Sequence, residues 1–156
     1  MVNDDYLGHV EHVRHCARGI VVKEGKVLLS HLSKYGYYMI PGGGVEVGET
    51  YPVCCERELL EETGIEVVAK EEIIEIEELF DDWRHFSHFF ICDPVRDTGV
   101  TNFTEPEKEA GYENVWLPLE EAIDIFGKYE DYRAEDVAIY GLYRREFSAL
   151  MEVMDG

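Results

Sequence analysis

One proline and three consecutive glycines, Pro41-Gly42-Gly43-Gly44, set the strongest local constraint on the fold of this chain. Proline cannot donate a main-chain hydrogen bond, and glycine lets the backbone turn and approach a neighbouring group closely. The run is therefore not expected to continue a regular element. We predict a shaped loop that can come close to a ligand.

A short helix is predicted directly after this loop. Thr50 offers an N-cap, Pro52 suits the first helical turn, residues 53–62 favour helix, and Gly64 is a natural C-terminal stop. The helix should therefore be well bounded at both ends.

Three carboxylates crowd one face of the predicted helix. At about 100° per residue, Glu58, Glu61 and Glu62 fall within one turn on the same side. A bound cation would relieve their mutual repulsion, and oxygen ligands favour Mg²⁺ or Mn²⁺ over zinc. A solvated acidic face explains the same spacing. An apolar stripe that can anchor the helix to a sheet lies beside the acidic face and comprises Pro52, Cys55 and Leu59.

The charge of the chain excludes one class of partner. Thirty-four acidic residues against 14 Lys and Arg give a net charge of −20, which should repel the backbone of polymeric DNA or RNA. The same charge would repel a small polyphosphate unless metal cations inverted the local field. An acidic protein with a phosphate substrate would therefore depend on its metal.

The chain is expected to be a single soluble domain over residues 1–156. It contains no apolar stretch of the roughly 18 residues that a membrane helix needs, and no repeat or linker divides it. Its cysteines, Cys16, Cys54, Cys55 and Cys92, show neither a CxxC pair nor zinc-ligand spacing. We expect reduced core thiols and a cytoplasmic protein.

Strands dominate the sequence on both sides of the predicted helix. A hairpin is expected around Glu24-Gly25, and further strands and two terminal helices follow from residue type and spacing. This order suggests an α/β sandwich with a mixed sheet. The predicted strands are 18–22, 26–30, 37–40, 72–80, 85–92 and 114–117, and the predicted terminal helices are 118–126 and 135–153, the latter with Ile139, Leu142, Tyr143, Phe147 and Leu150 at helical spacing.

The stretch from Gly43 to Ile65, GGVEVGETYPVCCERELLEETGI, resembles the Nudix box at every specified position. That pattern is G-x5-E-x7-R-E-U-x-E-E-x-G-U, where U is a bulky aliphatic residue. The matching positions are Gly43, Glu49, Arg57, Glu58, Leu59, Glu61, Glu62, Gly64 and Ile65.

The resemblance implies the Nudix fold, a mixed β-sheet sandwiched between helices (an α/β/α sandwich). It also implies hydrolysis of a nucleoside diphosphate linked to another moiety X, such as a nucleoside triphosphate, a nucleotide sugar or a dinucleotide. A non-catalytic domain that senses nucleotide is one alternative, although it would not need the full carboxylate set. An isomerase of prenyl diphosphates is another, and would require Cys92 or Cys16 in its pocket.

The resemblance further implies a metal site. Glu58 and Glu62 are expected to be the principal Mg²⁺ or Mn²⁺ ligands, Glu61 a further ligand or the general base, and the Gly42 carbonyl a ligand from the loop. Metal-activated water would then attack phosphorus.

Arg57 is expected to pair with Glu49, fixing the loop against the helix and orienting the carboxylates. Both residues therefore join the catalytic set of Glu58 and Glu61.

Members of the family often add a glutamate from the loop before the last strand. Here Glu105, Glu107, Glu109 and Glu113 compete for that place, and we favour Glu109, with a solvated charge as the alternative for each.

Contacts to the substrate are less constrained. Arg18 is a candidate phosphate ligand, and Tyr37, Phe80 or Trp83 could stack on a base, against ordinary core or surface roles for each.

Three further features lie outside the motif. His9, His12 and His15 recur every three residues without a matching acidic or cysteine partner, and we do not expect a metal site there. His85 and His88 should point to opposite sides of one strand. Arg144 or Arg145, predicted to be exposed on the last helix, could serve a homodimer contact.

Overall fold

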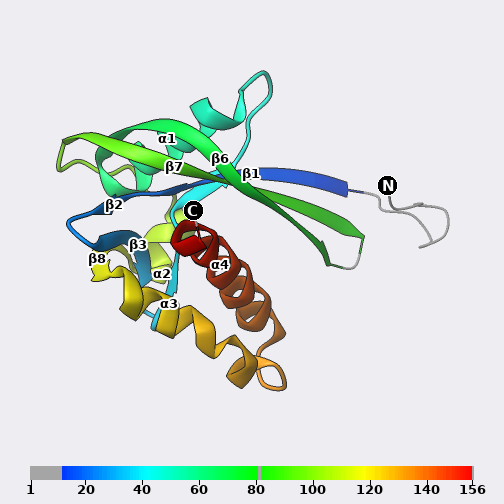
Figure 1. Ribbon diagram of the computed structural model, residues 1–156. Helices are drawn as coiled ribbons and strands as arrows, with labels where there is room; N and C mark the ends of the chain where they lie inside the picture. The colour runs from blue at the N-terminus through cyan, green and yellow to red at the C-terminus, as the bar shows by residue number, and fades with distance from the viewer. Residues whose placement is uncertain (1–11, 81, 156) are drawn as a thin grey trace.

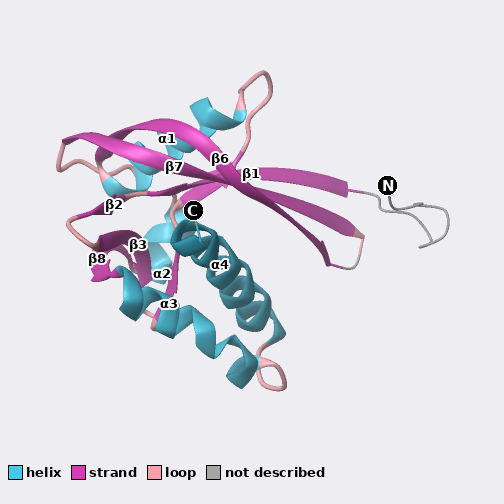
Figure 2. Cartoon of the chain, viewed as in Figure 1, coloured by secondary structure: helices cyan, strands magenta, loops and turns pink. Residues whose placement is uncertain are grey.

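The computed structural model describes residues 12–80 and 82–155, except for the Phe80 side chain. Two β-sheets form the middle of the molecule, with α1 (Tyr51–Thr63) on one side and α3 (Leu119–Gly127) and α4 (Val137–Asp155) on the other (Figures 1 and 2). The predicted α/β/α sandwich is confirmed. The predictions for His9 and for stacking by Phe80 fall outside the described atoms.

The first sheet is mixed and has the order β5-β1-β7-β6. In this sheet β1 (His12–Ile20) runs parallel to β7 (Trp83–Asp97). The other two pairings are antiparallel: β5 (Gly42–Gly44) pairs with β1, and β6 (Ile65–Phe80) pairs with β7. The β6–β7 hairpin is much longer than the strands predicted at 72–80 and 85–92.

The second sheet is antiparallel. It joins β2 (Val22–Lys23), β3 (Lys26–Leu32) and β4 (Tyr37–Met39), and β8 (Tyr112–Pro118) pairs with the remaining edge of β3. The hairpin predicted at Glu24-Gly25 is confirmed, and both turn residues have positive φ, as a tight hairpin turn requires. Its predicted first strand is divided, however, because residues 18–20 belong to β1 in the other sheet.

Alternation along β1 separates two cores. Ala17 and the following Val21 pack in the core beneath α1, with Leu59, whereas Ile20 packs in the core beneath α3 and α4, with Phe126. Successive side chains of a strand point to opposite faces, so one buried strand supports helices on both sides. This arrangement fixes α1 against the sheet and leaves its acidic residues near β5.

The boundaries of α1 agree with the predicted signals. Thr50 accepts a hydrogen bond from the Val53 main chain, and Gly64 ends the helix at φ 74°, a conformation that favours glycine. The predicted apolar stripe is wrong at one position, because Pro52 is exposed and Cys54 is buried in its place.

The C-terminal helices agree with the predicted ones within a few residues. The apolar spacing along α4 is confirmed, since Tyr143 and Leu150 are buried in the core that also contacts Ile139, Leu142 and Phe147. A short helix α2 (Glu105–Ala110) and a 3₁₀ helix at Lys128–Tyr132 were not predicted. None of the described helices is long and apolar enough to cross a membrane.

Candidate active site

The glycine run is extended rather than irregular. Gly42–Gly44 form β5 and pair antiparallel with Cys16–Arg18 of β1, so the prediction that this run cannot enter a regular element is wrong. Close approach explains the glycines. A Cβ at Gly43 would collide with the Glu58 carboxylate, and a Cβ at Gly42 would lie 2.6 Å from the Arg18 Cα and Cγ atoms.

Arg57 connects the loop to the helix through every nitrogen of its guanidinium. Its Nε donates to Glu49 Oε2 at 2.7 Å, and its Nη2 donates to Glu49 Oε1 at 3.0 Å and to the Gly44 carbonyl at 3.2 Å. Its Nη1 donates to Glu58 at 3.1 Å and to Glu61 at 3.3 Å. The predicted Arg57–Glu49 pair is confirmed, and its two parallel bonds fix the loop geometry.

The two partners stabilise each other's charged forms. Hydrogen bonding to Arg57 lowers the pKa of Glu49 to about 2, and the same bond raises the pKa of Arg57. Only 10 % of the Glu49 side chain is exposed. This end of α1 is therefore an ion pair that stays charged at neutral pH.

Glu58 and Glu62 have the opposite electrostatics. Burial, followed by interaction with Glu58, raises the pKa of Glu62 well above its ordinary value. Burial also raises the pKa of Glu58. Glu62 is only 4 % exposed, and Glu58 is partly buried. Two neighbouring carboxyls at this depth repel each other when both are charged, which favours a proton or a cation beside them.

Glu61 shares the Nη1 atom of Arg57 with Glu58. It accepts from Arg57 at 3.3 Å and is about one third exposed. Within residues 12–80 and 82–155, no three His, Cys, Asp or Glu side chains converge closely enough to hold a metal ion. The oxygen chemistry of Glu58 and Glu62 nevertheless fits a hard divalent cation, which would offset their negative charge.

The structure distinguishes the four glutamates near β8. Glu107 is close enough for its charge to contribute to the raised pKa of Glu62, after burial and Glu58. Glu105 pairs with Lys108 at 3.9 Å, and Glu113 pairs with His31 at 2.9 Å. Glu109 is exposed. The geometry thus favours Glu107, and the signal that could have identified it is the spacing from Thr104, with which it forms a capping box.

Of the predicted substrate contacts, Arg18 lies nearest the carboxylates. It is 7 % exposed, it donates from Nη1 to the Ile40 carbonyl at 3.3 Å, and the charge of Glu62 acts on it. Tyr37 instead packs edge-on against Tyr132 and Tyr143 in the core beneath α4. Trp83 stacks on His12, with ring centroids 4.6 Å apart.

The described histidines lie outside this site, and of the cysteines only Cys54 borders it, with its Sγ atom 3.4 Å from the Gly43 carbonyl. His15 and the buried His88 are 3.0 Å apart and stack with Tyr51 under the start of α1, whereas His85 is close to Arg14, whose charge, after burial, lowers its pKa. The prediction that His85 and His88 face opposite sides is confirmed. All four cysteines are free and buried, as predicted.

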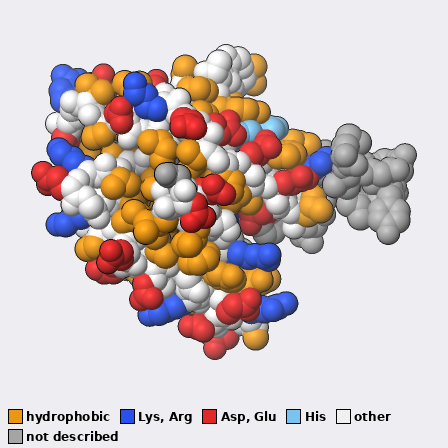
Figure 3. All heavy atoms as spheres, viewed as in Figure 1, with side chains coloured by type: hydrophobic (Ala, Val, Ile, Leu, Met, Phe, Trp, Pro, Cys, Tyr) orange, Lys and Arg blue, Asp and Glu red, His pale blue; other side chains and the backbone are white. Residues whose placement is uncertain are grey.

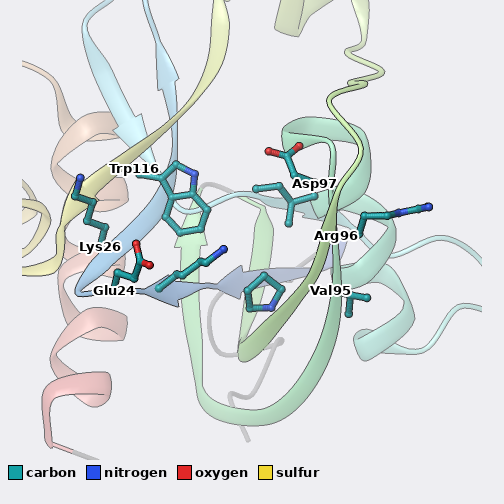
Figure 4. Close-up of a pocket in the computed structure, with 9 residues that line it drawn as sticks. Glu24, Lys26, Val95, Arg96, Asp97 and Trp116 are labelled. Atoms are coloured by element: carbon teal, nitrogen blue, oxygen red, sulfur yellow. The ribbon is translucent and has the colours of Figure 1, made fainter.

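One hollow of about 430 Å³ lies away from the acidic helix, between the β2–β3 turn and the end of β7 (Figure 4). The Trp116 ring faces its interior, but the labelled Lys26 and Arg96 side chains extend away from it. None of the glutamates of the acidic face lines this hollow. It therefore lacks the convergent polar groups that diphosphate chemistry needs.

Acidic side chains are spread over the face shown in Figure 3, among hydrophobic and basic ones. Acidic character alone therefore does not distinguish the candidate site, which is set apart by the burial of Glu62 beside Glu58.

Two sequence comparisons place the chain among known proteins. The family model described as the NUDIX domain matches residues 13–139. No curated protein sequence matches the chain closely enough to count as a relative.

Solved structures share the fold at low sequence identity. An ADP-ribose pyrophosphatase from Streptococcus suis has 18 % identity and a TM-score of 0.55, over 69 % of this chain and 75 % of that chain. A NUDIX hydrolase from Nitrosomonas europaea has 19 % identity and a TM-score of 0.61, over 78 % of this chain and 88 % of that chain. The solution structure of the E. coli ORF135 protein has 22 % identity and a TM-score of 0.59, over 90 % of this chain and 91 % of that chain.

The family match covers most of the chain, from β1 into α4, and it includes the loop, the Arg57 contacts and the carboxylates of α1. This protein belongs to the Nudix family.

Proposed function

We propose that this protein is a pyrophosphohydrolase that cleaves the diphosphate linkage of a small nucleotide: a nucleoside triphosphate, a nucleotide sugar or a dinucleotide. The observation that carries the proposal is the arrangement at α1, where Arg57 holds the loop, Glu58 lies against Gly43, and the buried Glu62 is close enough to Glu58 for each to affect the pKa of the other. A structure of similar fold is named an ADP-ribose pyrophosphatase, and this name supports a nucleotide-type diphosphate as the substrate class.

The cofactor proposed is Mg²⁺ or Mn²⁺, held by Glu58 and Glu62 together with the Gly42 carbonyl. When bound, it would polarise the bridging phosphates and lower the pKa of the attacking water. We assign Glu107, rather than Glu109, as the glutamate added from outside the helix, because its charge acts on Glu62.

Glu61 is proposed as the general base or a further metal ligand. It is more exposed than Glu58, and its partner Arg57 also binds Glu49, so a modest rotation would release it toward water. A carboxylate in this position can accept the proton of the attacking water. Arg57 and Glu49 act as positioning residues that hold the loop, and Arg18 is proposed to bind phosphate.

The alternative chemistry of an isomerase receives no support at Cys92. Its Sγ atom lies 3.5 Å from Cys55 Sγ in the core beneath α1, and Cys16 is likewise buried in β1. Four free, buried thiols support our proposal of a reducing, cytoplasmic location. A homodimer remains a prediction, and the exposed Arg144 is the candidate residue for its interface.

The test is turnover of a nucleotide panel with Mg²⁺, measured as phosphate-containing products. Glu62→Gln removes the charge with little change of volume, and we expect it to reduce turnover by roughly 10²–10⁴-fold. Glu66→Gln is the matched control, because Glu66 follows α1 directly but is half exposed and pairs with Arg96.

Undiminished turnover by Glu62→Gln would remove the proposed metal site. The absence of turnover on every nucleotide, with tight binding of one of them, would instead favour the sensing domain.

A further inference from the structure

Two arginines are buried together on the face of the first sheet that α4 covers. Arg18 projects from β1, and Arg145 projects from α4, where only 11 % of its side chain is exposed. Glu146, fully buried, and Glu78 of β6 complete the cluster. The prediction that Arg145 is an exposed dimer contact is therefore wrong, because the chain itself buries it.

The two guanidiniums are connected through the main chain of one residue, Ile40, and the carboxylate of Glu146. Arg18 Nη1 donates to the Ile40 carbonyl at 3.3 Å, and the Ile40 N–H donates to Glu146 Oε2 at 2.7 Å. The other oxygen of Glu146 accepts from Arg145 Nε at 2.9 Å. The cluster is thus fixed by the residue that precedes Pro41 and the glycine strand.

Each arginine nevertheless leaves one donor unused. Among the buried side-chain nitrogens and oxygens of the described residues, Arg18 Nε and Arg145 Nη2 are the two without a hydrogen-bond partner. Buried polar groups are normally bonded, and each exception calls for an explanation. Two exceptions within one cluster point to an acceptor that both arginines can share.

The electrostatics favour an anion as that acceptor. Burial and then the charge of Arg145 lower the pKa of Arg18, so the two cations repel each other in spite of Glu146. Glu78 is only loosely paired with Arg145, at 3.7 Å. Phosphate oxygens, like carboxylate oxygens, accept two parallel hydrogen bonds from a guanidinium fork.

The cluster borders both the candidate active site and a second hollow. Gly42 lies against Arg18 and the adjoining Gly43 lies against Glu58, so one strand separates the arginines from the carboxylates. On its other side, Arg145 lines a hollow of about 680 Å³ between β6 and α4, whose lining also includes the apolar Ile74 and Ile76, Tyr140, and the acidic Glu75, Glu77 and Glu78. That volume is in the range of small-molecule sites.

We propose that Arg18 and Arg145 together bind a phosphate group of the substrate, and that the hollow between β6 and α4 receives the organic group attached to it. The inference rests on the proposed function and deepens it. It names the substrate as an organic diphosphate recognised by two arginines, one of them on the last helix.

Binding of inorganic phosphate and pyrophosphate, measured by calorimetry in EDTA, tests the pair independently of metal and turnover. Wild type should bind pyrophosphate saturably. Arg145→Gln should weaken that binding at least tenfold, whereas Arg133→Gln, whose side chain is 69 % exposed, pairs with Glu130 and lies outside the hollow, should change it less than twofold.

Arg145→Lys is the second variant, since it keeps the charge beside Glu78 and Glu146 but lacks the planar fork. It should remain folded by circular dichroism and still lose pyrophosphate affinity. In turnover assays, it should raise KM more than it lowers kcat.

Saturable binding that is equal in wild type and folded Arg145→Lys and Arg145→Gln would show that the cluster only ties α4 to the sheet. Absence of pyrophosphate binding by wild type would also overturn the inference. Loss of pyrophosphate binding in the arginine variants of a protein that hydrolyses no nucleotide would retain the anion site and remove the hydrolase.

Discussion

Arginines are used in two different ways on the two sides of β5. On the α1 side, all three nitrogens of Arg57 donate to oxygens of the loop and helix. On the α4 side, Arg18 and Arg145 each keep one buried donor without a partner. A guanidinium whose donors are all used fixes a geometry, whereas one with a spare buried donor retains the capacity to bind.

Two carboxyl groups of the α1 side, those of Glu49 and Glu62, differ in the same way. Glu49, bonded to Arg57, has a pKa lowered to about 2, whereas Glu62, in contact with Glu58, has a pKa raised well above its ordinary value. The satisfied pair holds the active-site loop in place. The buried carboxyl of Glu62 on one side and the unpartnered Nη2 donor of Arg145 on the other indicate where ligands belong.

The largest expected effect on stability comes from breaking the satisfied side. Arg57→Ala leaves Glu49 charged and nearly buried without its partner, and we expect it to lower the free energy of unfolding by about 2–4 kcal/mol. Urea denaturation measures the change. Arg96→Ala is the control, because the Arg96 side chain is 71 % exposed and should cost less than about 1 kcal/mol. Equal losses in the two variants would contradict the distinction drawn for Arg57.

A smaller effect should come from filling the space between the loop and the carboxylates. In Gly43→Ala the new methyl group would displace the Glu58 carboxylate, and we expect a cost of about 1–3 kcal/mol together with weaker Mn²⁺ binding. Gly44→Ala is the matched control, since its methyl group would meet only the end of the Arg14 side chain, at 3.2 Å. The account predicts that only the Gly43 variant loses metal affinity, as measured by calorimetry.

The smallest effect concerns pH. Because the folded state lowers the pKa of Glu49 from 4.5 to about 2, its carboxylate stabilises the fold above pH 4.5, and that contribution disappears as the pH falls toward 2. After allowance for screening by solvent, about 1–2 kcal/mol should be lost. Denaturant unfolding of wild type and Glu49→Gln at several pH values should show the difference between them shrinking over this interval. A constant difference would argue against the Arg57–Glu49 pair as its source.

Local signals explain what could be predicted from the sequence. The limits of α1 follow from Thr50 and Gly64, and the Arg57–Glu49 pair follows from the spacing of a recognisable motif. Such features depend on neighbours along the chain or on a pattern that already includes both partners.

Features created by distant segments could not be predicted in the same way. Gly42–Gly44 become a strand only because β1 pairs with them, and Arg145 is buried only because Glu78 of β6 and the sheet lie against α4. Helical spacing alone places Arg145 beside Arg144 without showing which of the two faces the sheet. The position of Glu107 does carry a local signal, because Thr104 and Glu107 have the spacing of a capping box at the start of α2.

The most direct test of the account is a Mn²⁺ titration of wild type, Glu62→Gln and Arg145→Gln, followed by calorimetry. The account predicts saturable binding to wild type, at least tenfold weaker binding to Glu62→Gln, and binding to Arg145→Gln within twofold of wild type. Equal affinity of Glu62→Gln and wild type for Mn²⁺ would contradict the assignment of the buried carboxyl pair as the metal site.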